Sequence, residues 1–178
     1  TIYGGTTTLT QLGLSAPELD KDVQDAGEGA YISGFRMHDV TQIQFTGIKT
    51  FDQVLGASQM TFIAEAGLVQ VQDLKEGSGE IRYGRSPVFD STDNNDGFVT
   101  SESWGYRTRL TANYNDVFSG INLQPVIAFS HDVEGYAPQP GGVFIEGQQS
   151  IGITLNADYL NIYNASIGFT QYWGGDYS

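Results

Sequence analysis

The chain of 178 residues carries 21 acidic and 8 basic side chains, which give a formal charge of −13, and 39% of its residues are hydrophobic. So acidic a chain does not bind nucleic acid or an anionic surface through a basic patch. It contains no run of about 18 apolar residues, which excludes a helical membrane span, and no cysteine, which excludes disulfides, thiolate metal sites and cysteine nucleophiles.

Residues 1–39 differ in character from the rest of the chain. Residues 6–14 are compatible with a strand, whereas the acidic residues within 15–29 indicate a solvated loop. The polar start lacks the basic and then apolar run of a signal peptide. We therefore expect either a mature chain or one whose beginning is missing.

From residue 40 onward, extended segments alternate with connections. The 23 glycines and the 12% of aromatic residues favour an all-β fold. We predict strands at residues 40–51, 56–72, 100–114, 119–131, 149–159 and 162–173. Short turns follow the first, third and fifth strands, and long polar loops follow the second and fourth. Short turns at one end and long loops at the other are typical of outer-membrane barrels.

The predicted strands carry one apolar and one polar face. In the third strand Trp104 and Leu110 share one face, while Arg107 and Arg109 share the other. The same alternation fits a soluble β-sandwich, in which the apolar face would point into a core. Strand length favours the barrel, because several segments exceed ten residues where soluble strands average about five or six. Pro125 breaks a ladder hydrogen bond and predicts a bulge.

Aromatic residues mark both ends of the apolar face in two strands. Trp104 and Tyr114 lie ten residues apart, and so do Tyr163 and Trp173. At about 3.3 Å per residue and a tilt of about 40°, this spacing rises about 25 Å, the height of the apolar band between the aromatic girdles of a barrel. We expect the following residues to face lipid or lie in the girdles: Trp104, Leu110, Tyr114, Ile153, Leu155, Tyr159, Tyr163, Ile167, Phe169 and Trp173.

Five separated motifs resemble a large family of proteobacterial outer-membrane proteins that is known mainly as a domain of unknown function. They are LGA at 55–57 with EAG at 65–67, GFVTSESWGYR at 97–107, SHDVEGYAP at 130–138, FIEG at 144–147 and YWGG at 172–175. The resemblance covers residues 40–178.

This resemblance implies a longer barrel, of which the chain would be the C-terminal part. It also implies a periplasmic lipoprotein-carrier-like protein and a resistance-nodulation-division type exporter as neighbours, and traffic in hydrophobic or lipid-like compounds across the envelope. Six or seven strands do not close a barrel, whose smallest natural size is about eight. The chain also stops at residues 176–178, where a loop is expected. We therefore expect a partial barrel.

No catalytic residue is predicted. His38 with Asp39 and His131 with Asp132 resemble halves of catalytic pairs, but no activated nucleophile such as a nucleophile elbow accompanies them. We expect His131 to organise its own loop. Neither an enzymatic activity nor a cofactor is therefore predicted.

One loop offers several hard oxygen ligands. It contains Asp90, Asp93, Asn95 and Asp96, which are weak candidates for calcium binding. The run departs from the helix-loop-helix calcium pattern, because Thr92 takes the first ligand position and no glutamate closes the site. A solvated acidic loop without metal is therefore the preferred interpretation.

Four charged residues fall on the polar face by strand parity: Glu65, Arg107, Arg109 and Asp158. On a lumen wall, charges of both signs would set a transverse field that screens solutes. An internal ion-pair network that stiffens the barrel fits the same pattern. The sequence thus supports a porin-like transport barrel in outer-membrane lipid, with a structural or adhesive barrel and a soluble β-sandwich binding module as alternatives.

Overall fold

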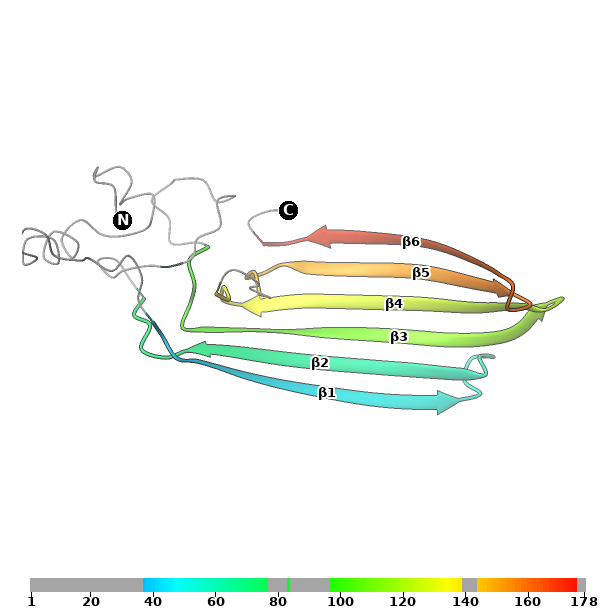
Figure 1. Ribbon diagram of the computed structural model, residues 1–178, viewed down its shortest axis with the longest axis horizontal. Coiled ribbons are helices and arrows are strands. Elements are labelled where there is room, and N and C mark those ends of the chain that lie inside the picture. Colours follow the sequence, from blue (N-terminus) through cyan, green and yellow to red (C-terminus); the bar gives the residue numbers. More distant parts are fainter. Residues whose placement is uncertain (1–36, 77–82, 84–96, 139–143, 176–178) are drawn as a thin grey trace, which may run out of the picture.

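The computed structural model describes residues 37–76, 83, 97–138 and 144–175. These residues form one antiparallel sheet whose strands follow the order of the chain (Figure 1). The strands are β1 (Val40–Asp52), β2 (Gln59–Val71), β3 (Glu102–Phe118), β4 (Ile121–Glu134), β5 (Gln149–Tyr159) and β6 (Tyr163–Trp173). Within the described residues β1 and β6 are the edges, so the sheet is open. No helix there is long and apolar enough to cross a membrane.

The prediction of an all-β chain with six strands is confirmed, and the short turns lie together at one end of the sheet (Figure 1). The limits of β3 and β4 differ from the prediction. The Asn115 and Asp116 pair reads as a turn but belongs to β3, where the register shifts between Tyr114 and Phe118. The actual turn is Ser119-Gly120, whose φ values of 47° and 85° match the left-handed geometry of a tight hairpin. The possible strand at 6–14, the acidic loop and the calcium candidates lie outside the described residues.

The bulge predicted at Pro125 is absent. Pro125 pairs with Leu155 in a continuous β4–β5 register. The register shifts of β4 against β3 lie instead next to Trp104 and after Tyr114. A proline removes only its own N–H, and within the described β3–β4 ladder Pro125 has no paired residue. The strand therefore accepts the proline without inserting an extra residue.

Cross-strand register gathers the apolar side chains on one face of the sheet. One row runs from β2 to β6 through Phe62, Leu110, Ile127, Ile153 and Phe169, each paired with the next. Because side chains directly opposite each other share a face, this row makes a continuous apolar stripe across five strands. We call this side of the sheet the apolar face and the opposite side the polar face.

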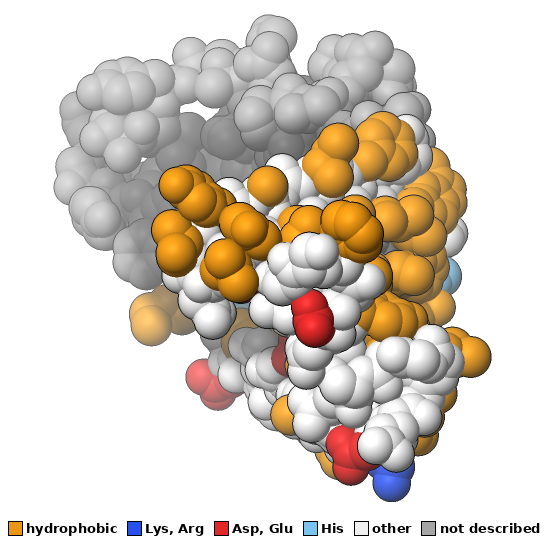
Figure 2. All heavy atoms as spheres, turned by 90° about the vertical axis from the view of Figure 1, so that its right-hand side faces the viewer, with side chains coloured by type: hydrophobic (Ala, Val, Ile, Leu, Met, Phe, Trp, Pro, Cys, Tyr) orange, Lys and Arg blue, Asp and Glu red, His pale blue; other side chains and the backbone are white. Residues whose placement is uncertain are grey.

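The apolar face is largely exposed. Phe45, Ile167 and Phe169 are 73%, 74% and 64% exposed. Viewed from the turn end, hydrophobic side chains form a band along one side of the molecule (Figure 2). In the part of the chain that the structure describes there is a single sheet, and no second sheet covers this face.

The small buried core lies on the polar face, at the end of the sheet that carries the long connections. It consists of Val69, Ala137 and Phe144. The last two belong to the connection between β4 and β5, so this connection folds over the polar face of β2 and β3. Backbone hydrogen bonds between Asp132 and the 147–148 segment hold it there, together with two bonds between Thr100 and Tyr136. In the latter pair the Thr100 N–H donates to the Tyr136 carbonyl, and the Tyr136 N–H donates to the Thr100 hydroxyl.

Candidate functional site: a charged cavity on the polar face

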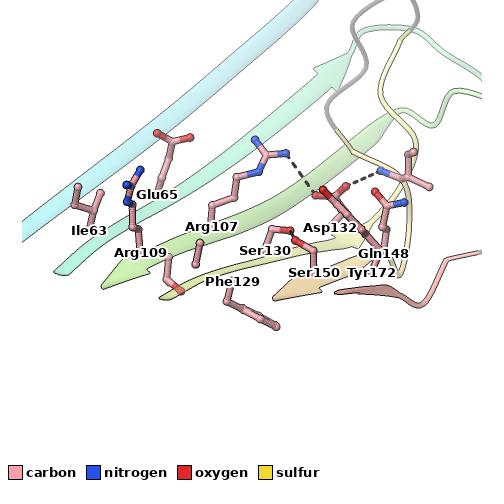
Figure 3. Close-up of a pocket in the computed structure, with 13 residues that line it drawn as sticks. Ile63, Glu65, Arg107, Arg109, Phe129, Ser130, Asp132, Gln148, Ser150 and Tyr172 are labelled. Carbon is pink, nitrogen blue, oxygen red and sulfur yellow. Dashed lines mark hydrogen bonds and ion pairs between the residues drawn. The ribbon is translucent and has the colours of Figure 1, made fainter. Parts of the chain in front are cut away.

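A cavity of about 570 Å3 opens on the polar face beneath the returning segment 144–148. Its chemistry comes from charged and hydroxyl side chains of β2 to β5: Glu65, Arg107, Arg109, Ser130, Asp132 and Ser150. Figure 3 shows these side chains projecting from the same side of the sheet, whereas Phe129 points to the other side. Strand alternation puts them on one face, since each belongs to the polar parity of its strand. The register then brings them together, because Arg107 pairs with Glu65 and Ser130, and Ser130 pairs with Ser150.

Arg107 and Asp132 join the sheet to the returning segment. The Arg107 guanidinium lies 3.9 Å from the Asp132 carboxylate, and Asp132 also accepts a 3.1 Å hydrogen bond from the Ile145 backbone N–H (Figure 3). Asp132 is buried, whereas the Arg107 side chain is half exposed. Solvent screening makes such a pair weak, so the backbone hydrogen bond is the stronger link.

Arg109 lies two residues further along β3, in different surroundings. Its cross-strand partners are Ile63 on β2 and Ala128 on β4, both apolar. Within the described residues its guanidinium makes no ion pair or hydrogen bond. By contrast, the partners of Arg107 in the ladders are Glu65 and Ser130. The two arginines therefore present one engaged and one available cation to the cavity.

Asp158 does not join this cavity. It lies at the turn end of the sheet, where its carboxylate accepts hydrogen bonds from the Asn161 backbone N–H at 3.0 Å and from the Asn122 amide at 3.4 Å. These bonds brace the turn between β5 and β6. All four charged residues thus lie on the polar face, as strand parity predicted, but only Glu65, Arg107 and Arg109 line this cavity.

The polar face around Asp158 is built from uncharged amides. A second cavity of about 490 Å3 lies there. A chain of side-chain hydrogen bonds crosses β3 to β6: Gln124 donates to Asn113 at 2.8 Å, Asn156 to Gln124 at 3.3 Å, and Ser166 to Asn156 at 2.8 Å. The polar face thus carries charges of both signs toward the long connections, whereas toward the turns amide side chains surround the carboxylate of Asp158.

Asp132 is a site residue that the sequence reasoning missed. Ending the fourth strand at His131 left Asp132 in a loop, whereas β4 continues to Glu134. Ala128 and Ser130 lie on the polar face, and the next residue of the same parity is Asp132. The alternation in the sequence could therefore have identified Asp132 as a polar-face residue. The same alternation sends His131 to the apolar face, where its ring packs against Tyr106.

The His-Asp pairs carry no catalytic geometry. His131 and Asp132 point to opposite faces, and the expectation that His131 organises its loop is wrong because it lies within β4. His38 Nδ1 lies 3.1 Å from the Gln72 carbonyl, and its ring contacts Tyr83. Within the described ranges no cluster of His, Cys, Asp or Glu is arranged to hold a metal ion.

The residues predicted to face lipid all lie on the apolar face. At the turn end Tyr159 stacks on Tyr163 with ring centroids 6.5 Å apart, and the Tyr114 hydroxyl donates to the Leu55 carbonyl at 3.4 Å. At the opposite end the Trp173 ring packs on Phe129 at 6.2 Å. Aromatic rings therefore border the apolar face at both ends, while contact with lipid stays a prediction.

Comparison with known proteins places the chain in a family. Neither curated proteins nor solved structures gave a match. The model of the family described as "protein of unknown function (DUF1302)" matches residues 3–178. The matched range begins at residue 3, so it also includes residues 3–39, which lie outside the motifs. The chain belongs to this family of unknown function.

Proposed function

We propose that the chain forms part of an outer-membrane β-barrel that acts as a channel or transport component for small hydrophobic or lipid-like solutes. The observation that carries this proposal is the exposed apolar face, which spans all six strands and is backed by a polar face with cavities. A bilayer solvates such an outer face, and water fills the inner one. Bulk water would make the same face an aggregation hazard.

The ends of the apolar face support the membrane assignment. Tyrosine and tryptophan rings prefer the boundary between hydrocarbon and headgroups, and they border this face at both ends. Lys49 is the cation of β1 on the same face; its ammonium lies 5.8 Å from the Phe51 ring centre, near the turn end. There a long side chain reaches the headgroups while its methylenes stay in the apolar layer.

The open sheet fits an arc of a larger barrel. Natural barrels contain at least about eight strands, and β1 and β6 each have one neighbour within the described residues. We infer that further strands pair with both edges and close the lumen around the polar face. A periplasmic carrier and an inner-membrane exporter are the proposed partners, on the strength of the family resemblance alone.

The proposal is tested with the full-length protein in detergent and in planar bilayers. We expect it to require detergent for dispersal, to fractionate with the outer membrane and to give discrete conductance steps. A protein that stays monodisperse in aqueous buffer without detergent would refute the barrel and support the soluble β-sandwich.

A structural or adhesive barrel is the second candidate. The observation that favours it is that the two long connections join strand ends at the same end of the sheet, where β2 and β4 end and β3 and β5 begin (Figure 1). Deletion of residues 84–96 separates the two functions. Adhesion to a partner surface should fall if those loops bind, whereas solute flux should persist if the barrel transports.

A further inference from the structure

Arg109 combines a positive charge with apolar neighbours. Its ladder partners Ile63 and Ala128 have no polar side chains, and all three line the charged cavity. Ile145, on the returning segment, lines the same cavity. A planar guanidinium fits a carboxylate in a bidentate manner. The adjoining aliphatic surface favours contact with the hydrocarbon part of a ligand over contact with water.

The acids of the cavity are engaged elsewhere. Asp132 is held by the Ile145 N–H and faces Arg107. Glu65 is the ladder partner of Arg107 and accepts a 3.4 Å hydrogen bond from Thr46. Glu65 therefore lies diagonal to Arg109 and not opposite it. Its charge repels a second negative charge in the cavity, so a singly charged head group is favoured over a doubly charged one.

The cavity has the volume and the mixed polar and apolar lining of a small-molecule site. Its volume of about 570 Å3 lies within the range of roughly 300 to 1,000 Å3 that is usual for such sites. The Ser130 and Ser150 hydroxyls, 2.7 Å apart, supply polar contacts on the side away from Ile63. Arg109 on β3 thus lies between Ile63 on β2 and Ala128 on β4, and the hydroxyls of Ser130 and Ser150 adjoin Ala128 on β4 and β5.

We propose that this cavity binds an organic monoanion, with its carboxylate on the Arg109 guanidinium and its hydrocarbon part along Ile63, Ala128 and Ile145. The inference rests on the proposed function, for which it names a substrate class: amphiphilic carboxylates. Arg107 adds long-range attraction for the anion. Because Arg107 lies beside the acids Asp132 and Glu65, the direct contact with the carboxylate falls to Arg109.

Calorimetric titration of the full-length protein in zwitterionic nanodiscs with submicellar sodium octanoate tests the site. We expect saturable binding that weakens at least about tenfold in Arg109→Gln, because a charge-assisted bidentate contact is lost. Lys49→Gln is the matched control, since it removes the same charge from the apolar face, and it should bind octanoate like the wild type. Ile63→Ser should weaken octanoate binding through the aliphatic wall alone.

Three results would overturn the assignment. Equal affinities of Arg109→Gln and wild type would remove Arg109 from the site. Binding of 1-octanol as tight as that of octanoate would make the cavity an apolar pocket, and equally tight binding of inorganic sulfate would make it a plain anion site. The titration needs no ionic current, so octanoate binding without conductance would refute the channel alone, and conductance without octanoate binding would refute the site alone.

Discussion

Gly67 is the direct cross-strand partner of Gly105, and the ring of Phe144 fills the space that the two glycines leave on the polar face. A Cβ built on Gly67 would lie 3.3 Å from the Phe144 ring, and one on Gly105 would lie 2.9 Å from it. The pair thus forms a notch two residues wide across β2 and β3. Phe144 in this notch fixes the returning segment over the charged cavity.

Gly105→Ala should displace the returning segment. The new methyl group would lie 2.7 Å from the His131 carbonyl oxygen, which belongs to the backbone of β4 and moves only with the strand. We expect a loss of about 1 to 3 kcal/mol of unfolding free energy, as for other overpacked sites, measured by urea titration. Limited proteolysis should show faster cleavage within the connection between β4 and β5, residues 135–148.

Gly47→Ala is the control for that substitution. Its Cβ would meet Phe45 at 3.8 Å, an ordinary contact, so stability and proteolysis should stay close to those of the wild type. Similar losses of unfolding free energy in both variants would show that the effect comes from replacing any strand glycine and not from the notch that holds Phe144.

An arginine at Ile167 should cost about 2 to 4 kcal/mol of folding free energy in a lipid bilayer. Ile167 lies near the middle of β6 on the apolar face and is 74% exposed. Leu110→Arg on β3 should behave in the same way. Urea titration of the full-length protein in phospholipid vesicles measures the cost.

The matched control is Thr170→Arg, on the polar face of β6 and also exposed. In a wet lumen this arginine should cost far less than the one at Ile167. Equal penalties at the two positions would contradict the assignment of lipid to one face and water to the other.

Replacing both Arg107 and Arg109 by Gln should shift ion selectivity toward cations. Both side chains line the charged cavity with Glu65, so their removal leaves the acid charge in excess. Reversal potentials under a salt gradient in planar bilayers measure the shift, and folding should be nearly unchanged. An unaltered reversal potential together with lost folding would favour a structural ion-pair network.

Asp132→Ala should destabilise the returning segment more than Asp132→Asn does. Alanine leaves the Ile145 N–H without its acceptor, which costs about 1 to 3 kcal/mol at a buried site. Asparagine keeps an acceptor oxygen and loses only the weak 3.9 Å pair with Arg107. Urea titration compares the two, with Glu134→Ala on the exposed end of β4 as control.

Strand parity predicted the two faces because side chains alternate between the faces of a strand with a period of two residues, which can be read from the sequence. The row from Phe62 to Phe169 and the shared face of Glu65, Arg107 and Arg109 follow from it. Parity assigns a side to each residue but no height along the strand, so it placed Asp158 with residues at the far end. The position of a residue along the strand depends on the register, and the register is determined by the turns and by long-range strand pairing.

The returning segment was beyond prediction for a different reason. Val69 and Phe144 meet through a fold-back of a long connection, and nothing local in either stretch encodes that contact. The length of β3 was underestimated because Asn115 and Asp116 are turn formers in isolation. The sheet overrides this preference by accommodating them at a register shift.

The two free edges of the sheet bear on how the proposed barrel would enter a bilayer. The outward N–H and C=O groups of β1 and β6 have no ladder partner within the described residues. Water satisfies such groups, but hydrocarbon leaves each one several kcal/mol less stable. Strands therefore cannot cross the lipid one at a time at low energy. Insertion kinetics should show a single cooperative phase in which edge pairing and membrane crossing coincide, with a rate set by the meeting of distant strands.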